Sequence, residues 1–155
     1  MISVEHQLNP KLTSRIVHRF DCVYPTRTAR FGNAMTATGV LNLRHASYAY
    51  DFQSIEKDCK CTTCRPRSEG GLEITRAYIH HLAAKETAGA HLLSVHNVFY
   101  LLDLLRRARQ AILNDEYPRF LRNHFHKMFK GQKDLYPEWA VDALKGVNVD
   151  ITMDT

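Results

Sequence analysis

The sequence has no long hydrophobic run. Its longest apolar stretch, Val98 to Leu105, is interrupted by Asp103, and it is far shorter than the roughly 20 residues that a membrane-spanning helix needs. Residues 1–12 have neither an apolar core nor a small-residue cleavage site, so they do not resemble a signal peptide. We therefore expect a cytosolic or matrix protein without a transmembrane segment.

Cysteine is scarce as well, with four in 155 residues. Three of them, Cys59, Cys61 and Cys64, lie within six positions, and Cys22 stands alone. A disulfide framework spreads its cysteines along the chain. This tight triplet, in a chain without a secretion signal, therefore indicates metal ligands.

Charge is not strongly biased to one sign. Lys and Arg number 21 against 16 Asp and Glu, a net charge of +5 with nine neutral histidines. The apolar content of 45% and charged content of 24% are typical of one globular domain and argue against a disordered or fibrous chain. The basic excess permits a nucleic-acid partner without requiring one.

The first third of the chain has the pattern of short strands and loops. Residues 1–18 show no clear period, and we expect them to be weakly structured. Phe20 to Pro25 predicts a strand end, followed by a basic loop over residues 26–33 that closes on the turn signal Gly32-Asn33. Further along, Ala34 to Thr36 and Val40 to Arg44 flank Thr38-Gly39 and predict a β-hairpin.

The middle and last parts differ from this beginning. Residues 51–71 are polar and loop-rich and contain the cysteine triplet. Beyond Leu72 the apolar spacing becomes helical, and we expect one face of a first helix to carry Tyr78, Ile79 and Leu82. A second helix is predicted from about Leu92 to Leu113. Its apolar face comprises Val98, Leu101, Leu102, Leu105, Ala108 and Ile112.

Two more helices are predicted near the C-terminus. One starts near Pro118, since proline suits a first helical turn. We expect it to bury four apolar side chains: Phe120, Leu121, Phe125 and Met128. A last short helix lies around Trp139, between Leu135 and Leu144.

The cysteine triplet predicts a zinc site. Closed zinc sites take four Cys or His ligands, and the Cys-x-Cys-x-x-Cys loop supplies three. Spacing alone leaves the fourth open among Cys22, His80, His81, His91 and His96. His96 is favoured because it opens the long helix, a rigid anchor for the loop. The alternatives are three unrelated thiols, or a catalytic zinc with a bound water.

Three further residues have both a structural and a functional interpretation. Asp21 ends an apolar strand, which is where α/β barrels place their chemistry, but such a residue commonly only caps a loop. Arg27 and Arg30, three positions apart in a basic stretch, are suited to phosphate or base edges. Alone they would more often be a solvated pair.

Four ordered motifs carry a family resemblance. The segment from Phe20 to Gly32 resembles the signature of the catalytic subunit of eukaryotic queuine tRNA-ribosyltransferases, in the tRNA-guanine transglycosylase family. The similarity runs from about residue 20 to about residue 145. The other matching stretches are Leu41-Asn42-Leu43-Arg44, the cysteine triplet, and Arg76-Ala77-Tyr78-Ile79-His80-His81-Leu82, which is followed by Ser94-Val95-His96-Asn97.

This resemblance implies a fold and a metal centre. The fold class is α/β: the C-terminal portion of a (β/α)8 TIM barrel with an inserted zinc-binding subdomain and C-terminal helices. The Zn²⁺ ligands implied by the family are Cys59, Cys61, Cys64 and His96.

The resemblance also implies a reaction. Asp21 would be the nucleophile that attacks C1′ of the anticodon wobble guanosine and expels guanine. Queuine would then displace the covalent ribosyl-aspartate, a double displacement like that of a retaining glycosidase. Arg27 and Arg30 fall at positions that contact anticodon bases. The implied partners are tRNA with a wobble guanine, the queuine base and a homologous non-catalytic subunit that forms a heterodimer. The implied location is the cytoplasm, with association at the mitochondrial outer membrane.

The sequence departs from the family in length. A (β/α)8 barrel needs about 250 residues, and residues 1–18 do not match the family. We therefore expect a truncated chain, whose segment 65–75 is also longer than the family spacing. Its predicted parts are a divergent segment 1–19, the last barrel strands 20–50, a zinc-binding subdomain 51–97 and C-terminal helices 98–155. The alternative functions are a non-catalytic zinc-binding fragment acting in subunit or tRNA binding, and a generic zinc-binding RNA protein.

Overall fold

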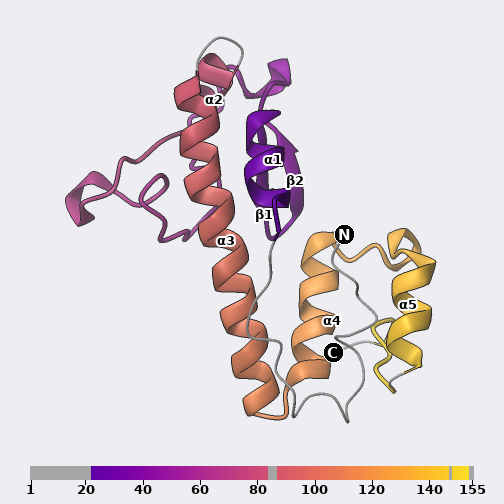
Figure 1. Cartoon of the computed structure of the whole chain (residues 1–155). Helices are drawn as coiled ribbons and strands as arrows, with labels where there is room; N and C mark the ends of the chain where they lie inside the picture. Colours follow the sequence, from indigo (N-terminus) through magenta and orange to yellow (C-terminus); the bar gives the residue numbers. More distant parts are fainter. Residues whose placement is uncertain (1–21, 84–86, 147, 154–155) are drawn as a thin grey trace. The chain divides into compact units, whose positions relative to one another are not determined.

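A computed structural model describes residues 22–83, 87–146 and 148–153 of the chain (Figure 1). The chain divides into two compact units. The first is formed by Val23–Leu105, and the second contains the C-terminal helices from Arg106 onward. Residues 1–18, expected to be weakly structured, and the strand residues Phe20 and Asp21 lie outside the described ranges.

The first unit begins with helix α1, Tyr24–Arg30, where the sequence predicted a strand end and a loop. Over Tyr24–Arg30 that prediction is wrong, because Pro25 stands in the first helical turn, where its missing N–H costs no hydrogen bond. The Thr28 hydroxyl donates to the Tyr24 carbonyl, 2.8 Å away. The helix ends at Arg30, and Gly32 follows with a φ of 75°, which glycine adopts easily. The turn predicted at Gly32-Asn33 is therefore present.

The predicted β-hairpin is confirmed. Strand β1, Asn33–Thr36, pairs antiparallel with β2, Gly39–Asn42, and Ala34 lies opposite Leu41. The second strand ends two residues earlier than predicted. One face of β1 is buried, with Ala34 and Thr36 inside, and Leu43 is buried just beyond β2.

The cysteine segment is loop-rich, as predicted. Two 3₁₀ turns punctuate the segment between β2 and the next helix, η2 at Ala46–Tyr48 and η3 at Arg67–Glu69. The longer segment 65–75 folds back on the cysteine loop. The Leu72 N–H donates to the Thr62 carbonyl at 2.8 Å, and the Ile74 N–H donates to the Thr63 carbonyl at 2.9 Å. These bonds make the segment part of the loop's structure.

Helix α2, Arg76–Ala83, and the part of helix α3, Thr87–Leu113, that precedes Arg106 complete the unit. Ile79 and Leu82 are buried as predicted, but Tyr78 is 49% exposed. Helix α3 starts five residues before the predicted Leu92.

The predicted buried face of α3 is wrong in its first half. Val98 and Leu102 are exposed, Leu102 by 63%. The buried positions follow the helical spacing i, i+3, i+4 and i+7 instead. They are Leu93, His96, Asn97 and Tyr100. The spacing of apolar residues did not identify this face, because two of its members, His96 and Asn97, are polar.

Helix α3 also has the length and hydropathy of a membrane span. A helix packed inside a protein meets the same criterion. In α3, His96 and Asn97 are completely buried and hydrogen-bonded to the hairpin, which favours a packed helix.

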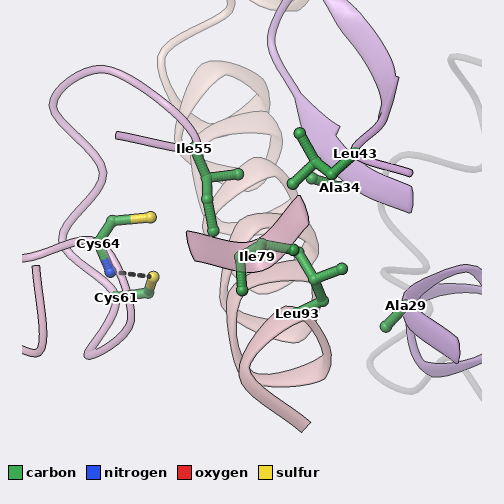
Figure 2. Packing of buried hydrophobic residues seen from close by; sticks show 8 residues of the cluster. All are labelled: Ala29, Ala34, Leu43, Ile55, Cys61, Cys64, Ile79 and Leu93. Carbon is green, nitrogen blue, oxygen red and sulfur yellow. Dashed lines mark hydrogen bonds between the residues drawn. The ribbon is translucent and has the colours of Figure 1, made fainter. Parts of the chain in front are cut away.

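One apolar cluster joins every part of the first unit (Figure 2). It takes side chains from α1, the hairpin, the cysteine loop, α2 and α3. Its buried members are Ala29, Ala34, Leu43, Ile55, Cys61, Cys64, Ile79 and Leu93. Because two of the predicted metal ligands belong to this core, the metal loop and the core are one packing unit.

The second unit has helices α4, Tyr117–Met128, and α5, Glu138–Lys145, with the 3₁₀ turn η4, Lys133–Leu135, between them. Helix α4 begins near Pro118 as predicted, but the four side chains expected to be buried are only partly covered. The Trp139 side chain is 61% exposed. The buried core residues of this unit are Tyr136, Leu144, Val149 and Ile151.

The named strands of the described ranges form one two-stranded antiparallel sheet. The protein is therefore a mixed structure of helices and a small sheet over these residues. A TIM barrel, whose strands are parallel, stays a prediction about the larger fold.

Candidate metal centre

The cysteine loop is shaped to bring its sulfurs together. The Cys64 N–H donates to the Cys61 carbonyl at 3.2 Å and to Cys61 Sγ at 3.3 Å, the bond drawn dashed in Figure 2. The Arg65 N–H also donates to the Cys61 carbonyl, at 2.9 Å. This tight turn holds two sulfurs on one side of the loop, and the backbone N–H stabilises negative charge on one of them.

His96 supplies the fourth donor from helix α3. Its Nδ1 lies 3.7 Å from Cys59 Sγ, 3.6 Å from Cys61 Sγ and 3.3 Å from Cys64 Sγ. All four candidate ligand atoms lie within 4.8 Å of one another. A tetrahedral zinc with Zn–S of about 2.3 Å and Zn–N of about 2.0–2.1 Å places nitrogen and sulfur about 3.5 Å apart. The donor set and its spacing therefore fit Zn²⁺, as expected from the sequence.

The other ring nitrogen of His96 fixes the orientation of the imidazole. Its Nε2 lies 2.9 Å from the Met35 carbonyl in β1. A carbonyl accepts only from a protonated nitrogen, so this bond leaves Nδ1 free to bind a metal. Such second contacts orient metal-binding histidines and raise their basicity.

The electrostatics of the metal-free cluster follow from crowding three thiols and an imidazole. Hydrogen bonds with Cys59 and Cys64 hold the pKa of Cys61 far below its usual range. Hydrogen bonds with Cys59 and Cys61 raise the pKa of Cys64, because a second thiolate would lie beside the first. Burial lowers the pKa of His96, but bonds with Cys59, Cys61 and Met35 outweigh it and raise that pKa to about 9.

The centre is closed rather than open. Cys61, Cys64 and His96 are buried, and Cys59 is half-buried. Four protein ligands leave no position for the water that a catalytic zinc carries. The geometry therefore favours a structural zinc. His80, one of the alternatives for the fourth ligand, instead contacts the Leu43 carbonyl through Nδ1 at 2.9 Å.

The two predicted arginines lie on α1. Arg27 and Arg30 are exposed, and at a spacing of three they share one side of the helix. Neither has an ion-pair partner among the residues that the structure describes. The exposed side chains of Tyr24 and Phe31 flank them. Asp21 lies outside the described ranges.

Sequence reasoning gave no role to Asn97, which is completely buried beside His96. Its side chain hydrogen-bonds to β1 and α1. The sequence does contain one indication of its importance: an amide residue follows a candidate metal ligand directly, on the side of the helix that packs inward.

Comparison with known proteins defines the family. The family model for queuine tRNA-ribosyltransferase matches residues 15–130, and the chain belongs to this family. It is 52% identical over 132 residues to the queuine tRNA-ribosyltransferase catalytic subunit of Schizosaccharomyces pombe, covering 85% of this chain and 33% of that protein.

Two further relatives have similar identity and coverage. The catalytic subunit from Caenorhabditis elegans is 47% identical over 111 residues, 71% of this chain and 26% of that protein. The queuine tRNA-ribosyltransferase of Lactiplantibacillus plantarum is 46% identical over 112 residues, 72% of this chain and 28% of that protein. The chain thus spans between 26% and 33% of these relatives.

Proposed function

We propose that the chain carries the nucleophile, the anticodon-contact helix and the zinc centre of a tRNA-guanine transglycosylase catalytic subunit. The observation that supports this most directly is the family match over residues 15–130 together with a closed Cys3His cluster within the matched region. The substrates would be a tRNA with a wobble guanine and the free base queuine.

In this proposal Asp21 performs the chemistry. Its carboxylate attacks C1′ of the wobble nucleotide, the bond from C1′ to guanine N9 breaks, and N9 of the departing guanine takes up one proton from an acid or from solvent. Queuine then attacks the same carbon through its N9 and releases one proton, the bond from C1′ to the Asp21 oxygen breaks, and the carboxylate is regenerated. Two inversions at C1′ retain its configuration, as in retaining glycosidases.

The exposed side of α1 suits RNA. Arg27 and Arg30 offer two neighbouring guanidinium groups, which bind phosphates and base edges in a fixed fork geometry. Tyr24 and Phe31, exposed by 49% and 60%, add aromatic surfaces on which unpaired bases can stack. An anticodon loop presents both phosphates and unstacked bases.

Assembly and location are part of the proposal. The family resemblance supports a heterodimer with a homologous non-catalytic subunit, in the cytoplasm and at the mitochondrial outer membrane. The barrel expected for the family would be completed outside the described residues.

The alternative is a non-catalytic role in tRNA or subunit binding. The observations that favour it are the closed Cys3His cluster, which has no open catalytic position, and the exposed arginines of α1. The arginine helix and zinc centre would serve binding equally well without Asp21.

Base exchange separates the two functions. The Schizosaccharomyces pombe relative would be prepared with its matching residues replaced by those of this chain, and queuine incorporation into tRNA would be measured. We expect Asp21→Asn to abolish exchange and to abolish the denaturant-resistant RNA adduct, with the zinc content unchanged. Asp115→Asn, at an exposed position with a φ of 56° that asparagine also tolerates, is the matched control.

Two outcomes count against the catalytic assignment. Full exchange by the Asp21→Asn chimera would exclude this residue as the nucleophile. An inactive chimera that still binds the tRNA through Arg27 and Arg30 would favour the binding function.

A further inference from the structure

The buried amide of Asn97 connects three elements of the first unit. Its Oδ1 accepts from the Met35 N–H in β1 at 2.8 Å. Its Nδ2 donates to the Asn33 carbonyl at 2.9 Å and to the Pro25 carbonyl of α1 at 3.0 Å. A third oxygen, Thr28 Oγ1, lies 3.3 Å away. Every hydrogen-bonding group of this side chain therefore has a partner on α1 or β1.

The contacts on α1 lie on the side of the helix opposite the arginines. At 100° per residue, Pro25 and Thr28 face away from Arg27 and Arg30. Pro25 and Ala29 are the buried residues of α1. Asn97 thus contacts the inner side of a seven-residue helix, which is too short to be stable without such contacts. The direction of the arginines on the outer side follows the orientation of this helix.

The same residue of β1 is also held by the metal ligand. The N–H of Met35 donates to Asn97, and its carbonyl accepts from His96. His96 and Asn97 are consecutive on α3, so the metal loop, the hairpin and α1 meet at adjacent positions of one rigid helix. The Pro25 carbonyl needs a donor and the Met35 N–H needs an acceptor. One amide side chain supplies both, which a carboxylate or an apolar group does not.

We propose that Asn97 is a positioning residue that sets the orientation of α1, and thereby of Arg27 and Arg30, relative to the zinc-anchored helix α3. This inference rests on the proposed function for its RNA consequence. Asn97 itself is buried and would not touch RNA.

The first test is Asn97→Asp in the complete 155-residue chain. Aspartate keeps the acceptor for the Met35 N–H and removes all three donor contacts, to Pro25, Thr28 and Asn33. We expect one zinc per chain to be retained. The amides of residues 27–30 should exchange with solvent at least about tenfold faster, while those paired between β1 and β2 stay protected. Val98→Ala, at the exposed next position of α3, should change neither readout.

A second variant approaches the contact from the other side. Thr28→Val leaves α3 and the metal loop untouched. It removes the oxygen that accepts from the Asn97 amide, together with the bonds that this hydroxyl donates to the Tyr24 and Pro25 carbonyls. A smaller increase in exchange, about two- to fivefold, is expected over the same four amides, since the bonds of Asn97 with Pro25 and Met35 remain.

The RNA readout distinguishes positioning from simple support. Binding would be measured to an anticodon stem-loop with guanine at the wobble position. Asn97→Asp should weaken binding about tenfold, and it should have no further effect when Arg27 and Arg30 are already alanine. A residue that only supported the fold would weaken both backgrounds equally.

Three results would overturn the proposal. The first is unchanged hydrogen exchange of residues 27–30 in both variants. The second is an equal effect of Asn97→Asp on RNA binding with and without the arginines. The third is loss of zinc together with loss of exchange protection across residues 23–105. Failure of the proposed function looks different. The stem-loop would then bind no better than an unrelated RNA and the arginine variants would have no effect, while hydrogen exchange would still decide whether Asn97 holds α1.

Discussion

His96 and Met35 join the metal centre to the hairpin. The Nδ1 of the imidazole faces three cysteine sulfurs, and its Nε2 donates to the Met35 carbonyl 2.9 Å away. Binding of Zn²⁺ at Nδ1 requires the ring proton to be on Nε2, and this bond favours the Nε2-protonated tautomer over the Nδ1-protonated one. Metal binding and packing of the hairpin against α3 therefore reinforce each other.

Removing zinc should destabilise the first unit strongly. Binding to a site that exists only in the folded chain is itself folding free energy, about 10–16 kcal/mol for small zinc domains at neutral pH. We expect one zinc per chain. A chelator should lower the melting temperature strongly, and it should speed hydrogen exchange over residues 51–97. Cys22→Ser should leave the zinc content at one, because Cys22 lies outside the cluster. A melting temperature insensitive to the chelator would exclude a structural metal.

Zinc binding should also release protons. At pH 7 the metal-free site holds a proton on His96, whose pKa is about 9, and one on Cys64, whose pKa is raised. Both must leave when the metal binds, so at least two protons are released and the apparent affinity falls by about a hundredfold per pH unit as the pH falls from 8 to 7. Calorimetry in buffers of different ionisation enthalpy measures the number. A value below two would contradict this protonation state.

The sequence predicted the metal centre better than it predicted the surroundings. Three cysteines in six positions indicate a metal from local spacing alone. The choice of His96 could not come from spacing, because the histidine lies 32 residues beyond Cys64, and it depended on the family resemblance. The ligand set is thus readable from motifs, whereas the hydrogen bond to Met35, across 61 positions, is a property of the fold.

Two errors have specific physical causes. Pro25 has the same fixed φ at a strand end and in a first helical turn, so its position did not distinguish a loop from α1. The face of α3 was misassigned because periodicity counts apolar residues, while the buried side includes Asn97. Its donors are satisfied by Pro25, 72 positions away. Local patterns do not contain such partners.

Arg76 should stabilise the base of the metal loop. Its Nη1 pairs with Asp51 at 3.0 Å, and its Nε and Nη2 lie 3.4 and 3.3 Å from the Ile55 carbonyl. The two paired side chains are each 22% exposed, so the loss is smaller than for a fully buried pair. We expect Arg76→Met to lower the free energy of unfolding by about 1–2 kcal/mol, because Asp51 loses its partner.

Chemical denaturation of the zinc-bound protein measures this loss. Arg67→Met, in the exposed 3₁₀ turn η3, is the matched control and should change stability by less than about 0.5 kcal/mol. Equal effects of the two substitutions would mean that the Asp51 pair contributes nothing.

Gly71 should be intolerant of any side chain. A Cβ at this position would collide with the backbone carbonyl of Arg65, and backbone cannot rotate away as a side chain can. The close approach is fixed by the bonds that fold segment 65–75 onto Thr62 and Thr63. Gly71→Ala should therefore destabilise the protein by about 1–3 kcal/mol, the usual cost of overpacking. It should also increase exchange of the Leu72 and Ile74 amides.

Gly146→Ala provides the contrast within the same chain. Its φ is −59°, and an added Cβ would meet only ordinary contacts of 3.5 and 3.6 Å. This substitution should be neutral or stabilising by about 0.4–1 kcal/mol, since alanine restricts the unfolded chain. The two variants share one chemical change, so denaturation midpoints compare the sites directly. If Gly71→Ala were as stable as Gly146→Ala, segment 65–75 would not be packed against the metal loop in the way that its hydrogen bonds require.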